Sequence, residues 1–588
     1  MELSDYIIKS KKLVKDSSMK NVRIAFLSNF TITGIAETMK FLCFKNGIYA
    51  ESYVSPYNQH IQDILNKSSG LYYFKPDIIF ILLDIENFLG DSFYFYYRMN
   101  GQQRNDLIQK KFDEVKELIK ILEKNTNAKI IVNNLLIPNY SSMGILENKQ
   151  DFGIKNGISH FNNMLELLSM NNPKLFIFDI NLFCSKVGYE FMRDRKISYL
   201  GDIKISPSAL IKLGFEYMGY IIPLMSMTKK CIVLDLDNTL WGGIVGEDGI
   251  ENIKLGLEKE GKPFLDFQKR LLELFERGII LVINSKNNYE DAIEVIKSHK
   301  YMILKEHHFA SMKINWQDKI SNMKEIAEEL NIGLDSFVYI DDDETNRELM
   351  RNFLPEVLVV DLPEDPCFYP SVIEDLTVFN LFNISDEDLN RGRMYADQNK
   401  RKQFKVEMVD IESFLKQLEI KVDIMQADKM TIPRIAQLTQ KTNQFNLTTR
   451  RYQEEDIKSL LEHDKYIIKC INVKDKFGDY GITGVVIIRK YNDEGCWNID
   501  TFLLSCRILG KNIEFSLMQN LIDNAKKAGV KNIHGRFIFT KKNKPAENFL
   551  EECGFILDKE ENGEKCYVLN IGNEKKNSSY AEVIEWKL

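Results

Sequence analysis

Residues 231–249, CIVLDLDNTLWGGIVGEDG, decide the fold of the middle of the chain. The four side chains at 231–234 are mostly apolar, which is typical of a buried strand. Asp235 and Asp237 follow at i and i+2, a spacing that turns both carboxylates to the same side of an extended backbone. Polar residues and glycines then indicate a loop. Because ligands of open parallel sheets bind at the carboxyl ends of the strands, we expect a ligand site here.

Two further strand-like segments end in polar residues. Residues 279–283 run into a stretch that contains Ser285, and residues 337–340 run into Asp341 and Asp342. Neighbouring carboxylates repel each other unless a cation or a shared proton lies between them. The simplest cation for an all-oxygen site is Mg²⁺, which usually also binds a substrate phosphate oxygen. A solvated acidic turn is the alternative interpretation.

These segments resemble the motifs of the haloacid dehalogenase (HAD) superfamily. The sequence at 235–239, DLDNT, is similar to motif I, DxDx(T/V). The resemblance implies that Asp235 is a nucleophile that attacks phosphorus and that Asp237 is the general acid and base. Ser285 resembles motif II, whose hydroxyl binds the transferred phosphoryl group; a helix cap is the alternative for this residue.

The same resemblance supplies a cation and the remaining metal ligands. Lys319 is similar to motif III, a cation that stabilises charge on the aspartyl-phosphate, and Lys313 is a weaker candidate. The acids at 341–343 resemble motif IV. The resemblance therefore implies a Mg²⁺ site made by Asp235, Asp237 through its backbone, Asp341 and Asp342.

The first part of the chain predicts a separate α/β domain. Strand patterns at 22–27, 48–54, 77–83, 129–133 and 175–180 alternate with helical patterns, as in a doubly wound sheet. Ser28, after the first strand, stands where an SGNH-type hydrolase keeps its serine. No DxxH motif follows, and the corresponding region at 202–207 reads DIKISP. We therefore favour a scaffold or carrier-docking domain over an esterase.

The last part of the chain has a different pattern. Strand-like segments at 467–473, 481–488 and 497–504 predict an antiparallel sheet with turns at Gly478-Asp479 and at 492–493. The following sequence, SCRILGKN, opens a helix and resembles motif A of the GNAT acyltransferases, R/Q-x-x-G-x-G/A. The resemblance implies that Arg507 and Gly510 bind the pyrophosphate of coenzyme A at the helix start. Asn512 replaces the second small residue, and an ordinary α+β domain is the alternative.

The whole order of motifs resembles the FkbH-like family. It runs from an α/β domain through DLDNTLWGG, INSKNN, INWQDK and FVYIDDD to SCRILGKN. The resemblance implies a glyceryl-acyl carrier protein (ACP) synthase of polyketide pathways. Such an enzyme takes a glyceryl unit from 1,3-bisphosphoglycerate, releases phosphate, and loads the phosphopantetheine thiol of an ACP. One departure is Asn346, which stands where the family usually has an acid.

Cys506 is a candidate for a thiol that carries the glyceryl group. It precedes Arg507 and lies near an expected helix start, two features that make a thiol more reactive. A buried apolar cysteine is the alternative, with direct transfer to the ACP thiol. The runner-up function is a phosphatase of small phosphorylated metabolites. A non-catalytic docking module on a carrier protein is a third possibility.

Composition narrows the class of protein. The 588 residues carry a net charge of −7, which gives no electrostatic reason to expect nucleic-acid binding. The nine cysteines form no CxxC pair, so we expect a cytoplasmic protein without disulfides. No apolar run reaches the length of a membrane span, and the start lacks an export signal.

We thus expect an α/β multidomain protein. The boundaries that the patterns predict are an SGNH-like α/β domain at 1–226, a HAD-like Rossmannoid domain at 227–370, a helical connector at 371–418 and a GNAT-like α+β domain at 419–588.

Overall fold

A computed structural model describes residues 1–16, 18–392, 394–395, 415–476, 478–491, 495–561, 563–575 and 581–585, without the side chains of 386 and 387. The chain divides into two compact units, Met1–Met225 and Ser226–Leu588. No helix among the described residues is both long enough and apolar enough to cross a membrane.

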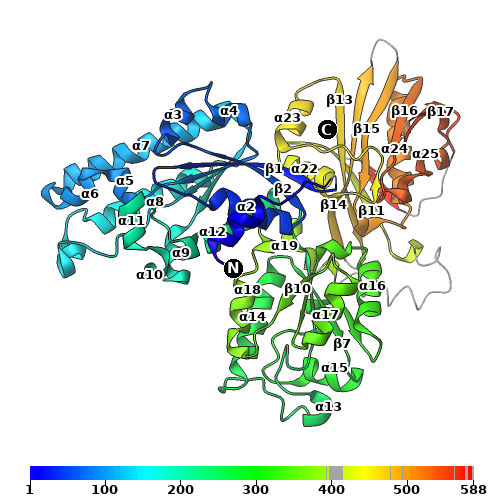
Figure 1. Ribbon diagram of the computed structural model, residues 1–588. Coiled ribbons are helices and arrows are strands. Elements are labelled where there is room, and N and C mark those ends of the chain that lie inside the picture. The colour runs from blue at the N-terminus through cyan, green and yellow to red at the C-terminus, as the bar shows by residue number, and fades with distance from the viewer. Residues whose placement is uncertain are drawn as a thin grey trace. The chain divides into compact units, whose positions relative to one another are not determined.

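The first unit is built on a five-stranded sheet with the order β2-β1-β3-β4-β5 (Figure 1). Every neighbouring pair is parallel. The central strand β3 has the sequence IIFIL and is buried along its whole length, as expected of a strand covered on both faces. The strands are β1 (Lys20–Ser28), β2 (Ile48–Val54), β3 (Ile78–Leu82), β4 (Lys129–Asn133) and β5 (Leu175–Phe178).

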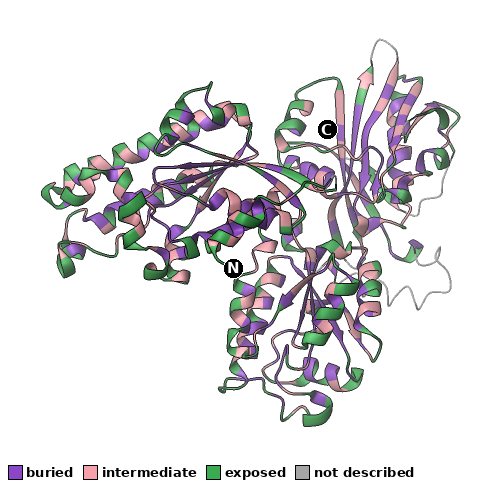
Figure 2. Ribbon diagram, in the orientation of Figure 1, coloured by how far each residue is buried: buried purple, intermediate pink, exposed green. Residues whose placement is uncertain are grey.

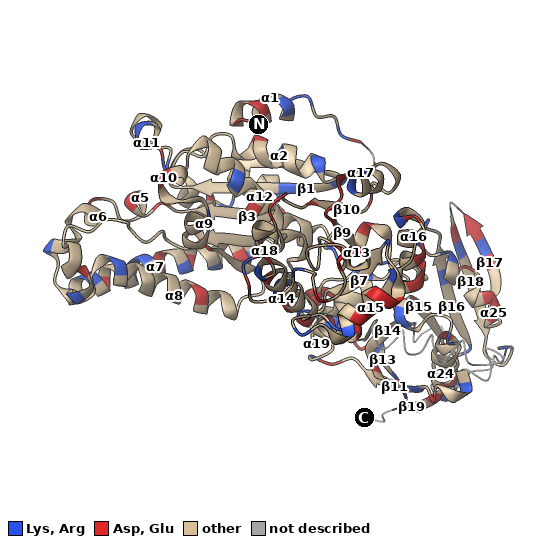
Figure 3. Ribbon diagram, turned by 90° about the horizontal axis from the view of Figure 1, so that it is seen from below, with Lys and Arg blue, Asp and Glu red and all other residues tan. Residues whose placement is uncertain are grey.

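Helices connect these strands. The longest, α7, carries ion pairs one helical turn apart, and Figure 3 shows acidic and basic residues mixed along it. Such pairs are typical of a solvated helix face. The helices are α1 (Leu3–Ser10), α2 (Ile35–Lys45), α3 (His60–Leu65), α4 (Gly70–Phe74), α5 (Ile85–Leu89), α6 (Asp91–Phe95), α7 (Gly101–Asn125), α8 (Ile154–Met170), α9 (Ile180–Val187), α10 (Tyr189–Met192), α11 (Arg195–Gly201) and α12 (Pro207–Leu224).

The second unit begins with another parallel sheet, in the order β10-β9-β6-β7-β8. Its strands are coloured as buried along most of their length in Figure 2, because apolar side chains cover both faces. The strands are β6 (Cys231–Leu234), β7 (Ile280–Ser285), β8 (Phe309–Ile314), β9 (Phe337–Asp341) and β10 (Leu358–Asp361). The helices are α13 (Val245–Asp248), α14 (Lys262–Glu276), α15 (Tyr289–Ser298), α16 (Lys319–Leu330), α17 (Glu344–Phe353), α18 (Tyr369–Glu374) and α19 (Asp386–Leu389).

The rest of this unit contains a nine-stranded mixed sheet in the order β17-β18-β16-β15-β14-β13-β11-β19, with β12 paired to β15. Its strands are β11 (Lys421–Gln426), β12 (Phe445–Asn446), β13 (Tyr466–Asp475), β14 (Gly478–Tyr491), β15 (Cys496–Leu504), β16 (Asn532–Ile538), β17 (Ile556–Glu561), β18 (Glu564–Asn570) and β19 (Glu582–Glu585). Its helices are α22 (Ile432–Lys441), α23 (Glu454–Leu461), α24 (Ile513–Lys527) and α25 (Phe549–Glu552).

Two expectations from the sequence differ from the structure. The turn predicted at Gly478-Asp479 is wrong, because both residues belong to β14 and pair with β13. The other expected turn, at 492–493, and the centre of the expected helical connector lie outside the described residues. In the described part of that connector, short helical segments such as α18 and α19 alternate with irregular chain.

Candidate active site

The strand ends of the second unit bring the expected motif residues together. Strand β6 lies between β9 and β7, and Leu234 pairs with Ile340 on one side and Ile283 on the other. The backbone N–H of Asp235 donates to the carbonyl of Ile340 at 3.1 Å. Because all three strands are parallel, the residues that follow them meet at one edge of the sheet.

Three carboxylates converge at this edge. Asp235, Asp341 and Asp342 each offer an oxygen, and these oxygens lie within 4.8 Å of one another. Oδ1 of Asp235 is buried and accepts no hydrogen bond from the described residues. Burial and the nearby Asp235 and Asp341 raise the pKa of Asp342 to about 6. An unsatisfied oxygen among mutually repelling carboxylates fits a hard cation such as Mg²⁺.

Lys319 holds two of these acids. Its side chain is 5% exposed, and Nζ lies 2.9 Å from Oδ2 of Asp235 and 2.6 Å from Oδ2 of Asp341. Burial alone would lower the pKa of Lys319, but the two carboxylates outweigh burial and raise it. Lys319 is the first residue of α16, and Asp318 caps this helix by accepting from the N–H of Ser321. The lysine is therefore cationic and rigidly placed.

Asp237 is held by three donors. Oδ1 accepts from the indole Nε1 of Trp241 at 2.8 Å and from the N–H of Val245 at 3.1 Å, and Oδ2 accepts from Nδ2 of Asn287 at 2.8 Å. Burial nevertheless raises the pKa of Asp237 above its usual value, since the donors only partly offset desolvation. A carboxyl that can hold a proton in a defined orientation can act as an acid and then as a base.

Ser285 ends β7 and is 1% exposed. Burial raises the pKa of Asp235, and an interaction with the hydroxyl of Ser285 offsets part of that rise. The alternative of a helix cap does not hold for this residue, because the residue that precedes α15 is Asn288. The hydroxyl of Ser285 thus lies next to the carboxylate cluster.

A second set of contacts orients Asp341. Its Oδ2 accepts from the hydroxyl of Tyr339, and its Oδ1 accepts from Nδ2 of Asn346 at 3.4 Å. Arg347 donates to the backbone carbonyls of Asp341 and Asp342 at 2.8 and 2.6 Å. Asn346, which departs from the family pattern, therefore orients the carboxylate of Asp341 by donating to it.

Lys313 does not reach this centre. Its ammonium lies 2.9 Å from Glu325 and 3.7 Å from Glu329 at the surface. Of the two candidates for motif III, Lys319 contacts the carboxylate cluster and Lys313 does not.

The structure does not bring Cys506 to the carboxylates. Cys506 lies in a 3₁₀ turn that follows β15, within electrostatic range of Lys230. Lys230 precedes β6 and Asp235 follows it, so about 16 Å of extended chain separates them. Helix α16 gives the same separation. It begins at Lys319, beside the carboxylates, and Asn331, just beyond its other end, donates to the carbonyl of Cys506 at 3.5 Å. The thiol and the carboxylate cluster therefore lie at opposite ends of the strands of this sheet.

The other residues expected to bind coenzyme A follow Cys506 in the chain. Nη1 of Arg507 donates to the carbonyl of Tyr480 at 3.1 Å. Gly510 has a φ of 74°, and Asn512, which precedes α24, has a φ of 58°. Asparagine is among the few residues that adopt this left-handed conformation readily, which explains how it stands where the motif has a small residue.

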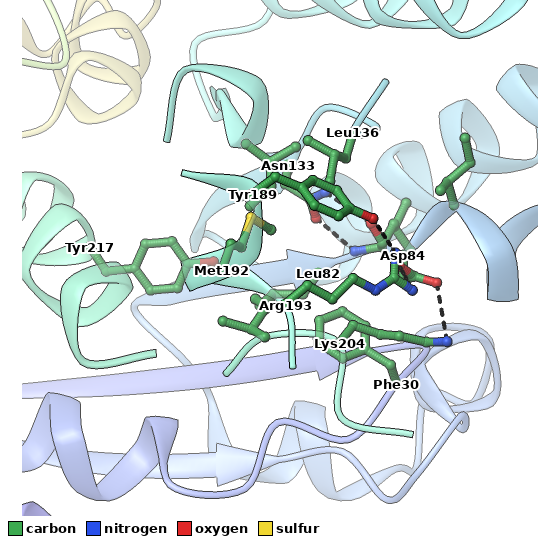
Figure 4. Close-up of a pocket in the computed structure, with 14 residues that line it drawn as sticks. Phe30, Leu82, Asp84, Asn133, Leu136, Tyr189, Met192, Arg193, Lys204 and Tyr217 are labelled. Carbon is green, nitrogen blue, oxygen red and sulfur yellow. Dashed lines mark hydrogen bonds and ion pairs between the residues drawn. The ribbon is translucent and has the colours of Figure 1, made fainter. Parts of the chain in front are cut away.

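In the first unit, Ser28 is 4% exposed and accepts the N–H of Phe30. Ion pairs lie at the end of the neighbouring strand β3, where Arg193 and Lys204 both approach Asp84 at 3.8 Å (Figure 4). A cavity of about 30 Å³ beside them has room for one or two water molecules. Ion pairs and buried side chains thus fill the space at these strand ends. The SGNH-like resemblance stays a prediction.

A family model matches most of the first unit. Residues 23–216 match the FkbH N-terminal domain. The expected resemblance to the FkbH family is confirmed.

Solved structures extend the comparison into the second unit. The chain is similar to the N-terminal part of the protein BF1531 from Bacteroides fragilis, which contains a phosphatase domain and was crystallised with Mg. The identity is 29%, the TM-score is 0.60, and the match covers 65% of this chain and 100% of that one. This similarity supports a HAD phosphatase-like fold. Together with the family match, it supports an enzyme that acts as a HAD-type phosphatase or in an FkbH-like role. No curated protein matches the chain.

Acetyltransferases align with the remaining region. A ribosomal-protein-S18-alanine N-acetyltransferase from Escherichia coli is 14% identical and has a TM-score of 0.21, and the match covers 27% of this chain and 98% of that one. A spermidine N-acetyltransferase from Vibrio cholerae is 14% identical with a TM-score of 0.21, over 26% and 97% of the two chains.

Sequence reasoning missed the partners of the acids. Trp241 and Asn287 stand inside the quoted motifs, yet no periodicity indicates that they contact Asp237. Tyr339 is part of an apolar strand, where a hydroxyl directed along the sheet edge has no sequence signal. A useful signal would have been polar residues two positions after a strand end, as Asn287 is after Ser285.

Proposed function

We propose that the chain is a Mg²⁺-dependent enzyme of the FkbH type that removes phosphate from a phosphorylated acyl unit and loads a glyceryl group on the thiol of an acyl carrier protein. The observation that carries the phosphate chemistry is the pairing of Lys319 with both Asp235 and Asp341, while Oδ1 of Asp235 accepts no hydrogen bond from the described residues. Such an oxygen is available as a nucleophile or as a metal ligand.

The residues divide the work in the following way. Asp235 attacks phosphorus, the bond from phosphorus to the alcohol oxygen breaks, and Asp237 gives its proton to that oxygen. Asp237 then accepts a proton from the water that cleaves the aspartyl-phosphate. Lys319 and the hydroxyl of Ser285 stabilise the phosphoryl oxygens. Mg²⁺ bound by Asp235, Asp341 and Asp342 would neutralise charge on the phosphate, as the Mg in the crystallised BF1531 fragment suggests.

The glyceryl transfer is a separate reaction. In 1,3-bisphosphoglycerate, one phosphate is an acyl phosphate and the other is a phosphate ester. A thiol sulfur attacks the carbonyl carbon, the bond to the acyl phosphate oxygen breaks, phosphate leaves with its electron pair, and the thiol proton passes to solvent. The phosphate ester is then the substrate of Asp235. The match to the FkbH domain and the motif resemblance support this assignment.

The thiol that accepts the acyl group is either Cys506 or the phosphopantetheine of the carrier. Cys506 is partly exposed, as a transfer thiol must be. Because it lies at the sheet edge opposite Asp235, the acyl group would have to move between the two sites on a carrier. The GNAT-like region, with Arg507 and Gly510, would bind the phosphopantetheine arm or coenzyme A.

Intact-protein mass spectrometry tests the proposal. The chain is mixed with Mg²⁺, 1,3-bisphosphoglycerate generated in place, and a phosphopantetheinylated carrier protein. We expect a glyceryl mass on the carrier with the wild-type chain and a phosphoglyceryl mass with Asp235→Asn. A mass on this chain that disappears in Cys506→Ala would assign the covalent thiol. Release of phosphate with an unmodified carrier would overturn the transfer.

The second candidate is a phosphatase that acts on a small phosphorylated metabolite. The separation of Cys506 from Asp235 favours it, because the carboxylate centre is complete without the thiol. Hydrolysis of free 3-phosphoglycerate as fast as that of the carrier-bound phosphoglyceryl group would support the phosphatase over the transferase.

A further inference from the structure

Several cationic side chains surround Cys506, at the strand ends opposite to those that carry the carboxylates. They come from segments far apart in the sequence: the residue before β6, the segment after α19, the end of α22 and the 3₁₀ turn after β15. We call them the basic cluster, and its members are Lys230, Arg391, Lys441 and Arg507.

The contacts of Cys506 and Arg507 given below are to uncharged groups. The hydroxyl of Tyr395 lies 3.9 Å from Sγ of Cys506. Nη1 of Arg507 contacts the carbonyl of Tyr480 at 3.1 Å and Sδ of Met394 at 3.0 Å. These contacts position the guanidinium without compensating its charge.

Few acids of the described residues face the cluster. Asp388 is 1% exposed; it pairs with Arg391 and lies 3.8 Å from Nζ of Lys441. Asp335 acts on Lys230 at longer range, and Nζ of Lys230 makes no hydrogen bond or ion pair within the described residues. Burial, together with Arg391 and Lys230, lowers the pKa of Lys441. The buried carboxylate of Asp388 is thus shared by Arg391 and Lys441, and an anion would stabilise the remaining positive charge of the cluster.

We propose that the basic cluster is a binding site for a phosphate group, placed so that the bound molecule reaches Sγ of Cys506. Arginine and lysine together are the side chains that bind phosphate most often, Arg by its fork of N–H donors and Lys as a point charge. The site is distinct from the carboxylate centre, because Lys230 and Asp235 lie at opposite ends of β6. The assignment of its ligand rests on the proposed function.

Two molecules in that function present the same chemistry. The phosphorylated acyl donor carries phosphate next to the carbon that a thiol would attack, and phosphopantetheine carries phosphate at the far end from its own thiol. The acyl donor would place its carbonyl carbon near Cys506 while its phosphate contacts the cluster, whereas the carrier arm would cover Cys506 with its phosphate end and keep its own thiol at the other end of the arm.

Protection of Cys506 from alkylation measures this binding. The full chain is treated with iodoacetamide, and each cysteine is quantified by peptide mass spectrometry with and without inorganic phosphate, 3-phosphoglycerate or pantetheine 4′-phosphate. Cys566, which is half-buried beside Glu564 at 3.9 Å, serves as the internal reference thiol. We expect phosphate compounds to slow alkylation of Cys506 at least threefold and to leave Cys566 unchanged.

Variants separate binding from general screening. Lys230→Met and Lys441→Met should each abolish the protection, whereas Lys474→Met, a surface lysine whose side chain is 48% exposed near Asp423 and Asp479, should keep it. Protection by 3-phosphoglycerate alone assigns the site to the acyl donor, and protection by pantetheine 4′-phosphate alone assigns it to the carrier arm. Equal protection by chloride at the same ionic strength, or none by any phosphate, would overturn the proposal.

Hydrolysis of p-nitrophenyl phosphate by the wild-type chain is measured in parallel. It tests the carboxylate centre alone, so a failure of the proposed phosphate chemistry is distinguishable from a failure of the basic cluster.

Discussion

The amide Nδ2 of Asn287 donates a hydrogen bond of 2.8 Å to Oδ2 of Asp237. The two residues come from different strand ends, since Asp237 follows β6 and Asn287 follows β7. The contact holds the carboxyl that we assign as acid and base in one rotation, and it leaves the other oxygen to Trp241 and the N–H of Val245.

Replacing Asn287 by Ala should slow phosphate-ester hydrolysis. A lost hydrogen bond to a charged group costs about 1.5–3 kcal/mol, which corresponds to roughly ten- to a hundredfold in kcat. Because the donor lowers the pKa of Asp237, its loss should also move the limb of kcat/KM that falls with rising pH to higher pH. Asn288→Ala is the control, since Asn288 contacts Trp316 and Asp291 instead. An unchanged pH profile would contradict the positioning role.

Lys319→Met should abolish activity and destabilise the second unit. Removal of one partner from a buried pair costs about 3–5 kcal/mol, because Asp235 and Asp341 are left without their cation. Added Mg²⁺ should restore part of the stability and none of the activity. No tryptophan occurs in residues 1–225, so tryptophan fluorescence during urea unfolding reports on the second unit.

Lys313→Met is the matched control for this change. Its ammonium pairs with Glu325 and Glu329 at the surface, so we expect a loss within about 1 kcal/mol. If Lys319→Met unfolds at the same urea concentration as Lys313→Met, the buried pairing does not stabilise the fold as described.

The fold was more predictable from the sequence than the site. The strands at 231–234 and 129–133 coincide with β6 and β4, because continuous apolar runs bounded by polar residues are typical of buried parallel strands. Asp235, Ser285, Lys319 and Asp341 meet because each lies at or next to the end of an element that the sequence indicates. The separation of Cys506 from them was not predictable, since it depends on how the mixed sheet packs against the sheet edge, and no local pattern encodes that packing.

Binding of Mg²⁺ should depend on pH around 6. The pKa of Asp342 is raised to about 6 by burial and by Asp235 and Asp341, so below this pH a proton occupies the carboxylate that the metal needs. Affinity should fall by up to tenfold per pH unit below about 6 and be nearly constant above 7. Calorimetric Mg²⁺ titrations from pH 5 to 8 measure this. Asp342→Asn should bind more weakly and with a flatter pH dependence; an identical slope would assign the proton to another group.

Asn346→Asp should make the fold more dependent on metal. The substitution removes the amide that donates to Oδ1 of Asp341 and places another carboxylate beside it. We expect lower stability without Mg²⁺ and a larger rise in melting temperature on its addition than in the wild-type chain. Glu348→Gln, on the same helix and paired with Arg351 at the surface, is the control. A smaller Mg²⁺-dependent rise in Asn346→Asp would show that the amide does not orient Asp341.

Strand β6 separates Lys230 from Asp235, and this separation sets how an intermediate would travel. An acyl group received at Cys506 and dephosphorylated at Asp235 would have to pass from one end of β6 to the other on its carrier. If the carrier dissociates between the two steps, an added pool of unlabelled carrier-bound intermediate dilutes an isotopic label before it reaches the product; a carrier that stays bound while its arm moves leaves the label undiluted.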